Sequence, residues 1–175
     1  IDPIKEKMLH EYAVADNITL TKVDRPQQAL FELVKSAGVI SLRQSTDDTA
    51  LLGYKTLSEE LQDADAVFVP TSSGTLALAL ALQTNAHVHA VQTTVCNPFT
   101  SPFDTEFEKE DESLAGAIVD RVGQRKNDLI PRLSGGWVIS KEEIMDAIRI
   151  VKETTDLDIS PNSALSVAGL MKTIK

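Results

Sequence analysis

The feature that most constrains the fold is a stretch, residues 66–82, that changes character twice. It opens with the apolar residues 66–69, which lie between Asp65 and Pro70. A short apolar run of this kind predicts a strand that is buried on both faces. Residues 76–82 are all Leu or Ala. These are strong helix formers, and a helix that is apolar all round must be buried. The stretch therefore predicts a strand, a tight turn and a buried helix.

The turn between this strand and this helix consists of Thr71, Ser72, Ser73, Gly74 and Thr75. A strand-to-helix turn leaves the first backbone N–H groups of the helix without partners and directs them at an anion. Gly74 has no side chain, so a phosphate group can approach the main chain closely, and the hydroxyl groups are further donors. We therefore predict a phosphate-binding turn. The alternative, equally compatible with these residues alone, is an ordinary turn in which Ser or Thr caps the helix.

Length, charge and cysteine content limit the class of protein. The 175 residues are enough for one domain, or for one domain and part of a second. The net charge of -9 argues against nucleic acid or an anionic membrane as a partner, and no uncharged apolar run is long enough to span a bilayer. Because Cys96 is the single cysteine, no internal disulfide can form, and we expect a cytoplasmic location.

The rest of the hydrophobic pattern predicts alternating helices and strands. Helices are expected at residues 3–12, 26–37, 47–61 and 165–174 and after Ser140, and further strands at residues 18–23, 39–42, 88–95 and 137–139. Ser140 and Glu143 have the spacing of a capping box. Residues 97–112 hold two prolines and a run of acids, so we expect a long excursion over the surface.

Alternation of strands and helices predicts an α/β fold with a mostly parallel sheet and helices on both faces, in three layers. In such sheets, ligands bind at the carboxyl ends of the strands. Two polar turns have this predicted placement, one at residues 71–75 and one at Pro161.

Other chemistry-bearing residues give weaker indications. His87 and His89 lie on one side of a predicted strand, as two zinc ligands do, but no third or fourth ligand is suggested nearby, so no metal site is predicted. Cys96 has no His partner that the sequence indicates, and we expect a small buried hydrophobic residue. Lys55 is expected on a helix surface. No Ser-His-Asp triad is recognisable.

Five segments resemble, in order, the motifs of one protein family. Residues 51–61 resemble its Glu-Gly-x-Lys-Thr-x-x-x-Glu-Ile helix, and residues 67–74 resemble its Val-x-Val-Pro-x-Gly-x-Gly phosphate turn. Residues 113–118 are similar to Thr-Ile-Ala-x-Gly-Ile, residues 139–144 to Val-Ser-Asp-Glu-Glu-Ile, and residues 160–170 to Glu-Pro-x-Ser-Ala followed by Ala-Gly-Leu. The family is the fold type II (tryptophan synthase β) class of pyridoxal-phosphate-dependent enzymes, with threonine synthase and threonine dehydratase as the nearest members.

The resemblance implies roles for particular residues. Thr71 to Thr75 would hold the phosphate of pyridoxal phosphate. Asn162 or Ser163 would approach the pyridine nitrogen, where an amide or a hydroxyl suits a neutral ring. Residues 1–45 would be part of the family's small domain. Residues 46–175 would be the portion of the large domain that carries the phosphate-binding turn.

The chain also departs from the family's pattern. Ser72 and Ser73 stand where the family has glycines, and Ser160 stands where it has Glu. The lysine that binds the cofactor covalently and the Ser-x-Gly-Asn loop would both lie upstream of Ile1. We therefore expect a C-terminal portion of such an enzyme, or a degenerate relative, that binds the cofactor weakly and is inactive by itself.

The function predicted in this way is that of a pyridoxal-phosphate-dependent lyase or synthase acting on threonine or a related (phospho)hydroxy-amino acid. Its partner would be a small amino-acid substrate, and a homodimer is a possible assembly. Two alternatives stay open. One is a non-catalytic phosphate-ligand module, and the other is a sugar-phosphate-binding α/β domain of the isomerase type, whose Ser- and Thr-rich turns also bind phosphate.

Overall fold

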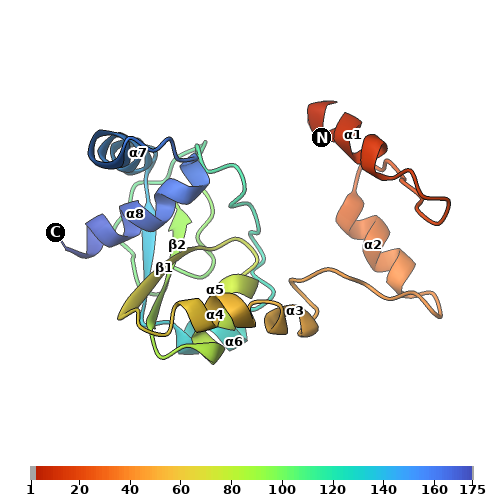
Figure 1. The fold of residues 1–175 in the computed structure, drawn as a ribbon, viewed down its shortest axis with the longest axis horizontal. Helices are drawn as coiled ribbons and strands as arrows, with labels where there is room; N and C mark the ends of the chain where they lie inside the picture. Colours follow the sequence, from red (N-terminus) through yellow and green to blue (C-terminus); the bar gives the residue numbers. More distant parts are fainter. Residues whose placement is uncertain (1–2, 175) are drawn as a thin grey trace. The chain divides into compact units, whose positions relative to one another are not determined.

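Three parallel strands form the centre of residues 43–174 in this computed structural model, which describes residues 3–174 of the chain (Figure 1). The strands β1 (Ala66–Pro70), β2 (His87–Thr93) and β3 (Gly135–Ile139) lie side by side in that order. Val69, Ala90 and Gly136 stand opposite one another in one row across the sheet. The predicted α/β fold with a parallel sheet is confirmed.

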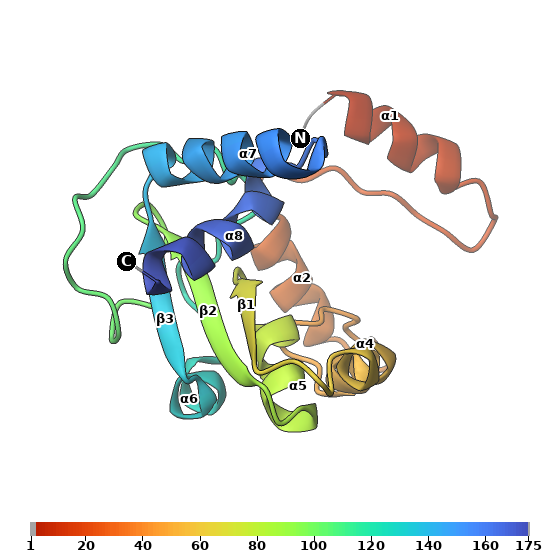
Figure 2. The ribbon, with the colours of Figure 1, turned by 60° about the vertical axis from the view of Figure 1, so that its left-hand side comes forward.

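Helices cover both faces of this sheet (Figure 2). One face carries α5 (Thr75–Gln83), α6 (Lys126–Leu129) and the 3-10 turn η1 (Ile130–Arg132), and the other carries α7 (Lys141–Thr155) and α8 (Pro161–Thr173). Each face has its own hydrophobic core. The core on the α5 side consists of Val69, Ala77, Leu78, Leu80, Val88, Ala90, Phe99, Leu129 and Leu133. The core on the α7 and α8 side consists of Val91, Cys96, Ala115, Ile118, Ile139, Ile144, Ala147, Ala164, Leu165 and Ala168.

Polar residues fix where α7 and α8 begin. Ser140 Oγ accepts a hydrogen bond from the N–H of Glu143 at 3.2 Å, and Glu143 Oε2 accepts one from the N–H of Ser140 at 2.8 Å, so the predicted capping box is confirmed. Helix α8 begins at Pro161, four residues earlier than predicted, because Ser160 caps it and proline suits the first helical position. None of the helices in the described part of the chain has both the length and the apolar character needed to cross a bilayer.

The helix predicted from Asp47 or Asp48 to Leu61 is instead two short helices. These are α3 (Thr49–Leu52) and α4 (Lys55–Glu60), and the break lies at Gly53, a residue that disfavours a helix interior. Asp47 Oδ1 accepts hydrogen bonds from the hydroxyl and the N–H of Thr49, at 2.7 Å and 2.9 Å. These bonds, with the positive charge of Arg125 in addition, hold the pKa of Asp47 below its usual value.

Residues 97–100 are buried or half-buried, so the predicted surface excursion is wrong for the start of residues 97–112. Phe99 and Thr100 are fully buried. The cause is Gln92, a buried residue of β2 whose Oε1 accepts hydrogen bonds from the N–H groups of Phe99, at 2.7 Å, and Thr100, at 3.2 Å. Residues 101–112 are exposed or half-buried, as expected for the rest of the excursion.

Residues 1–42 form a separate unit, within which the structure describes α1 (Pro3–Tyr12) and α2 (Pro26–Val34). The strands predicted at residues 18–23 and 39–42 are absent. A strand must pair its backbone N–H and C=O groups with a neighbouring strand, and residues 3–42 contain no such neighbour. None of residues 3–42 is buried. The assignment of residues 1–45 to a small domain stays a prediction.

A row of aromatic side chains crosses the sheet face that α8 covers. Phe68, His89 and Trp137 come from the three strands, with ring centroids 4.7 Å apart for the first pair and 6.4 Å apart for the second. A Cβ atom on Gly135 would lie 2.6 Å from His89 Nδ1, so glycine leaves room for the imidazole. Burial, followed by the nearby charge of His87, lowers the pKa of His89.

The lowered pKa of His89 predicts a pH-dependent stability. In the unfolded chain the imidazole titrates at about 6.5, so the unfolded state binds a proton at a higher pH than the folded state does. The contribution of His89 is therefore fully present above about pH 7, and it is lost as the pH falls below about 6.5. We expect His89→Gln to flatten the decline in the free energy of unfolding between about pH 7 and pH 5. His87→Gln removes only the lesser cause of the lowered pKa of His89 and should flatten the decline much less; an unchanged decline in His89→Gln would contradict the assignment.

Candidate functional site

The residues of the predicted phosphate-binding turn lie between β1 and α5, at the carboxyl end of a strand. Gly74 immediately precedes the helix in the left-handed conformation, with φ of +85°, and no side chain caps the helix. The nine residues of α5 are long enough to form a helix N-terminus with several unpaired N–H groups. The local fold is therefore the strand, tight turn and buried helix that the sequence predicted.

Three consecutive N–H groups in this turn have no hydrogen-bond partner. Within residues 3–174, the N–H groups of Ser72, Ser73 and Gly74 donate to no protein acceptor. The neighbouring N–H groups differ: that of Thr71 donates to the carbonyl of Val91 at 2.9 Å, and that of Thr75 lies 3.5 Å from Ser73 Oγ. Unpaired N–H groups at a helix N-terminus, together with the helix dipole, favour an anion.

A cavity of about 150 Å³ opens over the turn. Its lining residues are Gln44, Tyr54, Pro70, Thr71, Ser72, Ser73, Gly74, Thr75, Leu76 and Ala77. This set contains no lysine or arginine, so the donors available to an anion there are the backbone N–H groups, the Ser72 hydroxyl and the side-chain amide of Gln44. All five residues of the predicted turn line this one cavity.

Most hydroxyl groups of the turn are already committed within the protein. The hydroxyl of Thr71 donates to the carbonyl of Val69 at 2.7 Å, and that of Thr75 donates to the carbonyl of Gln44 at 3.1 Å. Because the Thr75 proton is used in this way, the hydroxyl of Ser73, 3.1 Å away, must donate to Thr75 Oγ1. Three of the four hydroxyl protons are therefore used within the protein, and the main chain is the larger source of donors.

Ser72 accepts two hydrogen bonds and keeps its own proton. Its Oγ accepts from the N–H groups of Val119, at 3.2 Å, and Asp120, at 3.3 Å. No described acceptor takes the Ser72 hydroxyl proton, so it is available to a ligand in the cavity. The loop around Val119 is therefore fixed to the turn by the serine that stands in place of a family glycine.

Gly74 is required by its surroundings as well as by its backbone conformation. A Cβ atom there would lie 2.9 Å from an edge carbon of the Phe99 ring and 3.2 Å from Leu129. Any side chain at position 74 would therefore point into the core on the α5 side. The residue type alone indicated close approach of a phosphate at Gly74; the structure gives a packing reason in addition.

The second predicted pair, Asn162 and Ser163, lies at the start of α8. Asn162 Oδ1 accepts a hydrogen bond from the N–H of Ala117 at 3.1 Å, and Ser163 Oγ lies 3.0 Å from Ser160 Oγ. Neither residue lines the cavity over the turn. The loop of residues 117–120 connects the two places, because it contacts Asn162 at one end and Ser72 at the other.

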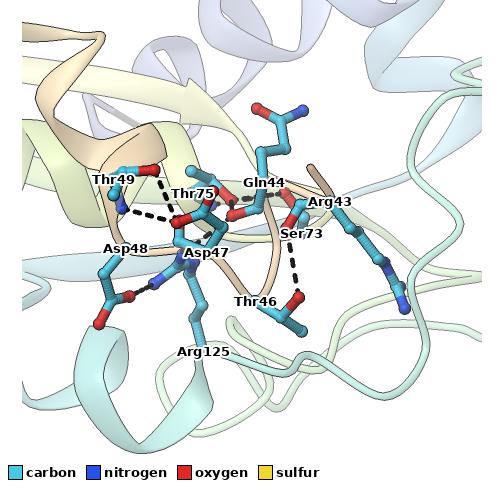
Figure 3. Close-up of polar contacts among 9 residues, drawn as sticks. All are labelled: Arg43, Gln44, Thr46, Asp47, Asp48, Thr49, Ser73, Thr75 and Arg125. Atoms are coloured by element: carbon cyan, nitrogen blue, oxygen red, sulfur yellow. Dashed lines mark hydrogen bonds and ion pairs between the residues drawn. The ribbon is translucent and has the colours of Figure 1, made fainter. Parts of the chain in front are cut away.

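Sequence reasoning missed the residues that form the far wall of the cavity. Gln44 and Tyr54 line it, and the hydroxyl of Tyr54 donates to Gln44 Oε1 at 3.2 Å. Arg125 holds the main chain of this wall from behind: its Nη2 donates to the carbonyls of Gln44, at 2.9 Å, and Asp47, at 3.0 Å (Figure 3). Arg125 lies 81 positions from Gln44 and 78 from Asp47, and no local pattern indicates such contacts.

The remaining chemical candidates lie elsewhere. His87 is exposed and lies 3.1 Å from Ser134, and His89 is stacked between Phe68 and Trp137. The described residues contain no group of three or more His, Cys, Asp or Glu side chains placed to hold a metal. Burial raises the pKa of the Cys96 thiol, which suits an inert core residue.

Comparison with known proteins gives one family match. A family model described as "Pyridoxal-phosphate dependent enzyme" matches residues 2–175. No curated protein sequence matches the chain.

Solved structures with the same fold include three amino-acid enzymes. Serine racemase from Dictyostelium discoideum has 21% identity and a TM-score of 0.69 over 98% of this chain and 59% of that one. Threonine deaminase isoform 2 from Solanum lycopersicum, in its processed form, has 20% identity and a TM-score of 0.70 over 95% and 50%. A pyridoxal 5'-phosphate-dependent aspartate racemase has 19% identity and a TM-score of 0.70 over 96% and 56%. The chain thus spans between half and three fifths of each of these proteins.

Proposed function

Since the chain belongs to the fold type II family of pyridoxal-phosphate-dependent enzymes, we propose that it is the C-terminal portion of a lyase or synthase acting on threonine or a related (phospho)hydroxy-amino acid. The phosphate of the cofactor is held at Thr71 to Thr75. The lysine that binds the cofactor covalently is supplied by a segment N-terminal to Ile1. The enzyme works in the cytoplasm as a homodimer on a small amino-acid substrate.

One observation carries the proposal for the phosphate. The N–H groups of Ser72, Ser73 and Gly74 are consecutive, lack protein acceptors in the described chain, and belong to residues that line one cavity at the N-terminus of α5. Three unpaired N–H donors match the acceptor oxygens of a phosphate monoester. The free Ser72 hydroxyl is a fourth donor. The residues present therefore fit the phosphate of pyridoxal phosphate.

Other residues would act on the ring and on the substrate. Pyridoxal phosphate, when bound, supplies an electron sink that stabilises negative charge at the α-carbon of an amino acid. Asn162 and Ser163 are proposed to face the ring nitrogen. A neutral amide or hydroxyl there leaves the nitrogen unprotonated, whereas a carboxylate would keep it protonated. The loop of residues 117–120, which contacts both Asn162 and Ser72, fixes the distance between the ring end and the phosphate end of the site.

The residues that line the cavity are consistent with a cofactor-binding lysine that comes from outside this chain. No lysine is among the lining residues, and Lys55, on α4, is exposed and lies 3.8 Å from Glu59. The proposal therefore predicts weak, noncovalent binding of the cofactor by residues 1–175 alone, with the phosphate end as the anchor.

A melting experiment tests the phosphate site. We expect inorganic phosphate and pyridoxal phosphate to raise the Tm of the chain, because a ligand at ten times its Kd stabilises the folded state by about 1.4 kcal/mol. Pyridoxal, which lacks the phosphate, should raise it far less. A larger shift with hexose phosphates than with pyridoxal phosphate would favour the sugar-phosphate alternative and contradict the proposal.

A matched pair of variants places the ligand in the turn. Ser73→Asp puts a carboxylate beside the unpaired N–H groups, where it favours the helix but competes with an anion. We expect this variant to lose the shift caused by phosphate without a lower Tm of its own. Ser101→Asp adds the same charge at an exposed position and should keep the shift. Retention of the shift in Ser73→Asp would mean that the anion binds elsewhere.

A further inference from the structure

Arg125 is a buried arginine that hydrogen-bonds to the main chain of residues 44–47, about 80 positions earlier in the sequence. Its side chain is 5% exposed, and it lies just before α6. Nη1 pairs with Asp48 Oδ1 at 2.8 Å, and Nη2 donates to the carbonyls of Gln44 and Asp47 (Figure 3). Asp48 is 86% exposed, so the buried part of this contact is the pair of main-chain carbonyls. A guanidinium has the planar, forked donors that such a double contact needs.

The carbonyl of Gln44 joins Arg125 to the turn. It accepts from Arg125 Nη2 at 2.9 Å and from the Thr75 hydroxyl at 3.1 Å, which uses both of its lone pairs. Thr75 Oγ1 in turn accepts the hydroxyl of Ser73. Figure 3 shows this sequence of contacts from Arg125 to Ser73. The position of the carbonyl thus sets the positions of Thr75 and Ser73.

We propose, on the basis of the proposed phosphate site, that Arg125 is a positioning residue for the turn. It holds the Gln44 carbonyl in place, and through Thr75 and Ser73 it keeps the unpaired N–H groups arranged for a phosphate. Arg125 does not line the cavity, so it acts on the ligand through the main chain and not by direct contact. The same hydrogen bond fixes the backbone of Gln44, which lines the cavity.

The first test compares three variants in the full 175-residue chain, with inorganic phosphate as the probe. Phosphate affinity is measured well below the Tm of every variant, so that loss of stability alone does not change it. We expect Arg125→Met to weaken binding about tenfold and Arg125→Lys, which keeps the charge but not the fork, about threefold to fivefold. Arg121→Met removes the same charge from an exposed position of the same loop and should stay within twofold of the wild type.

A double-mutant cycle separates positioning from a merely structural role. Thr75→Val removes the hydroxyl that links the Gln44 carbonyl to Ser73, and we expect it to weaken phosphate binding as well. If the two residues act along one line of contacts, Arg125→Lys should cost little affinity once Thr75→Val is present. This cycle does not require Arg125→Met to fold.

The outcomes are distinguishable. Wild-type chain that binds neither phosphate nor pyridoxal phosphate would overturn the proposed function and this inference together. Wild-type binding with unchanged affinity in Arg125→Lys and Arg125→Met, or additive losses in the double mutant, would overturn the role of Arg125 alone. Faster hydrogen exchange in ligand-free Arg125→Lys than in the wild type is expected at Thr71 and Leu78, whose N–H groups donate to the carbonyls of Val91 and Gly74 at the two ends of the turn. It would be an independent sign of a loosened turn, and unchanged exchange there would count against the positioning role.

Discussion

Phe99→Ala is expected to lower the free energy of unfolding by about 3–5 kcal/mol, the range for truncating a fully buried phenylalanine. The ring has no exposed surface. It packs against the backbone of two glycines, Gly74 and Gly123. A Cβ atom would lie 2.9 Å from a ring carbon at Gly74 and 3.1 Å from one at Gly123. Removal of the ring leaves a cavity directly beneath the proposed phosphate-binding turn. Denaturant melts of the variant and the wild type measure the difference.

Phe103→Ala is the matched control. Phe103 comes from the same segment and has the same side chain, but it is 41% exposed, so its truncation should cost less than about 1.5 kcal/mol. If the two variants lose equal stability, residues 97–104 are not packed as the structure places them. We also expect Phe99→Ala to weaken phosphate binding, because the turn loses its support from the core.

The strand–turn–helix unit could be predicted from the sequence because its signals are local. Apolar residues 66–69, the polar turn and the Leu/Ala run each fix a type of backbone, and the structure places β1, the turn and α5 there. The family, inferred from five short motifs, is confirmed by the match over residues 2–175. The carboxyl-end placement of the turn follows from parallel strands alone.

The fold was predicted wrongly where the structure of a segment depends on a partner that is distant in the sequence. Residues 18–23 alternate as a strand does, but the described part of their unit gives them no neighbour. Residues 97–104 are rich in proline and turn formers, which describes their backbone correctly. Phe99 and Thr100 are buried nevertheless, because Oε1 of Gln92 accepts hydrogen bonds from their N–H groups. A single glutamine in a strand gives no sign of this role.

The same distinction between local signals and distant partners explains why only part of the site could be predicted. Donors on the main chain of the turn could be located from residue types, because a helix N-terminus always leaves N–H groups unpaired. The wall opposite them could not, because Gln44 and Arg125 are brought there by folding and have ordinary sequence neighbours. The places of Asn162 and Ser163 relative to the cofactor, taken from the resemblance, stay a prediction.

Gln92→Leu is expected to lower the free energy of unfolding by about 3 kcal/mol. Gln92 is fully buried, and its Nε2 donates to the carbonyl of Thr71 at 2.8 Å while its Oε1 accepts from the N–H groups of Phe99 and Thr100. Leucine fills a similar volume but leaves the carbonyl of Thr71 and the N–H of Phe99 without a partner, whereas the N–H of Thr100 keeps its 3.3 Å hydrogen bond to the carbonyl of Asn97. Each buried polar group left unpaired costs about 1–3 kcal/mol, less where water enters.

The position of Gln92 also connects stability to the site. Its amide fixes the carbonyl of Thr71, the first residue of the turn, from the neighbouring strand. We therefore expect Gln92→Leu to weaken phosphate binding under conditions where the variant is still folded. Gln124→Leu, at an exposed position, should change the free energy of unfolding by less than about 0.5 kcal/mol and leave the affinity unchanged. A Gln92→Leu protein as stable as the wild type would show that the carbonyl of Thr71 and the N–H of Phe99 find other partners, and that the turn is not held from β2.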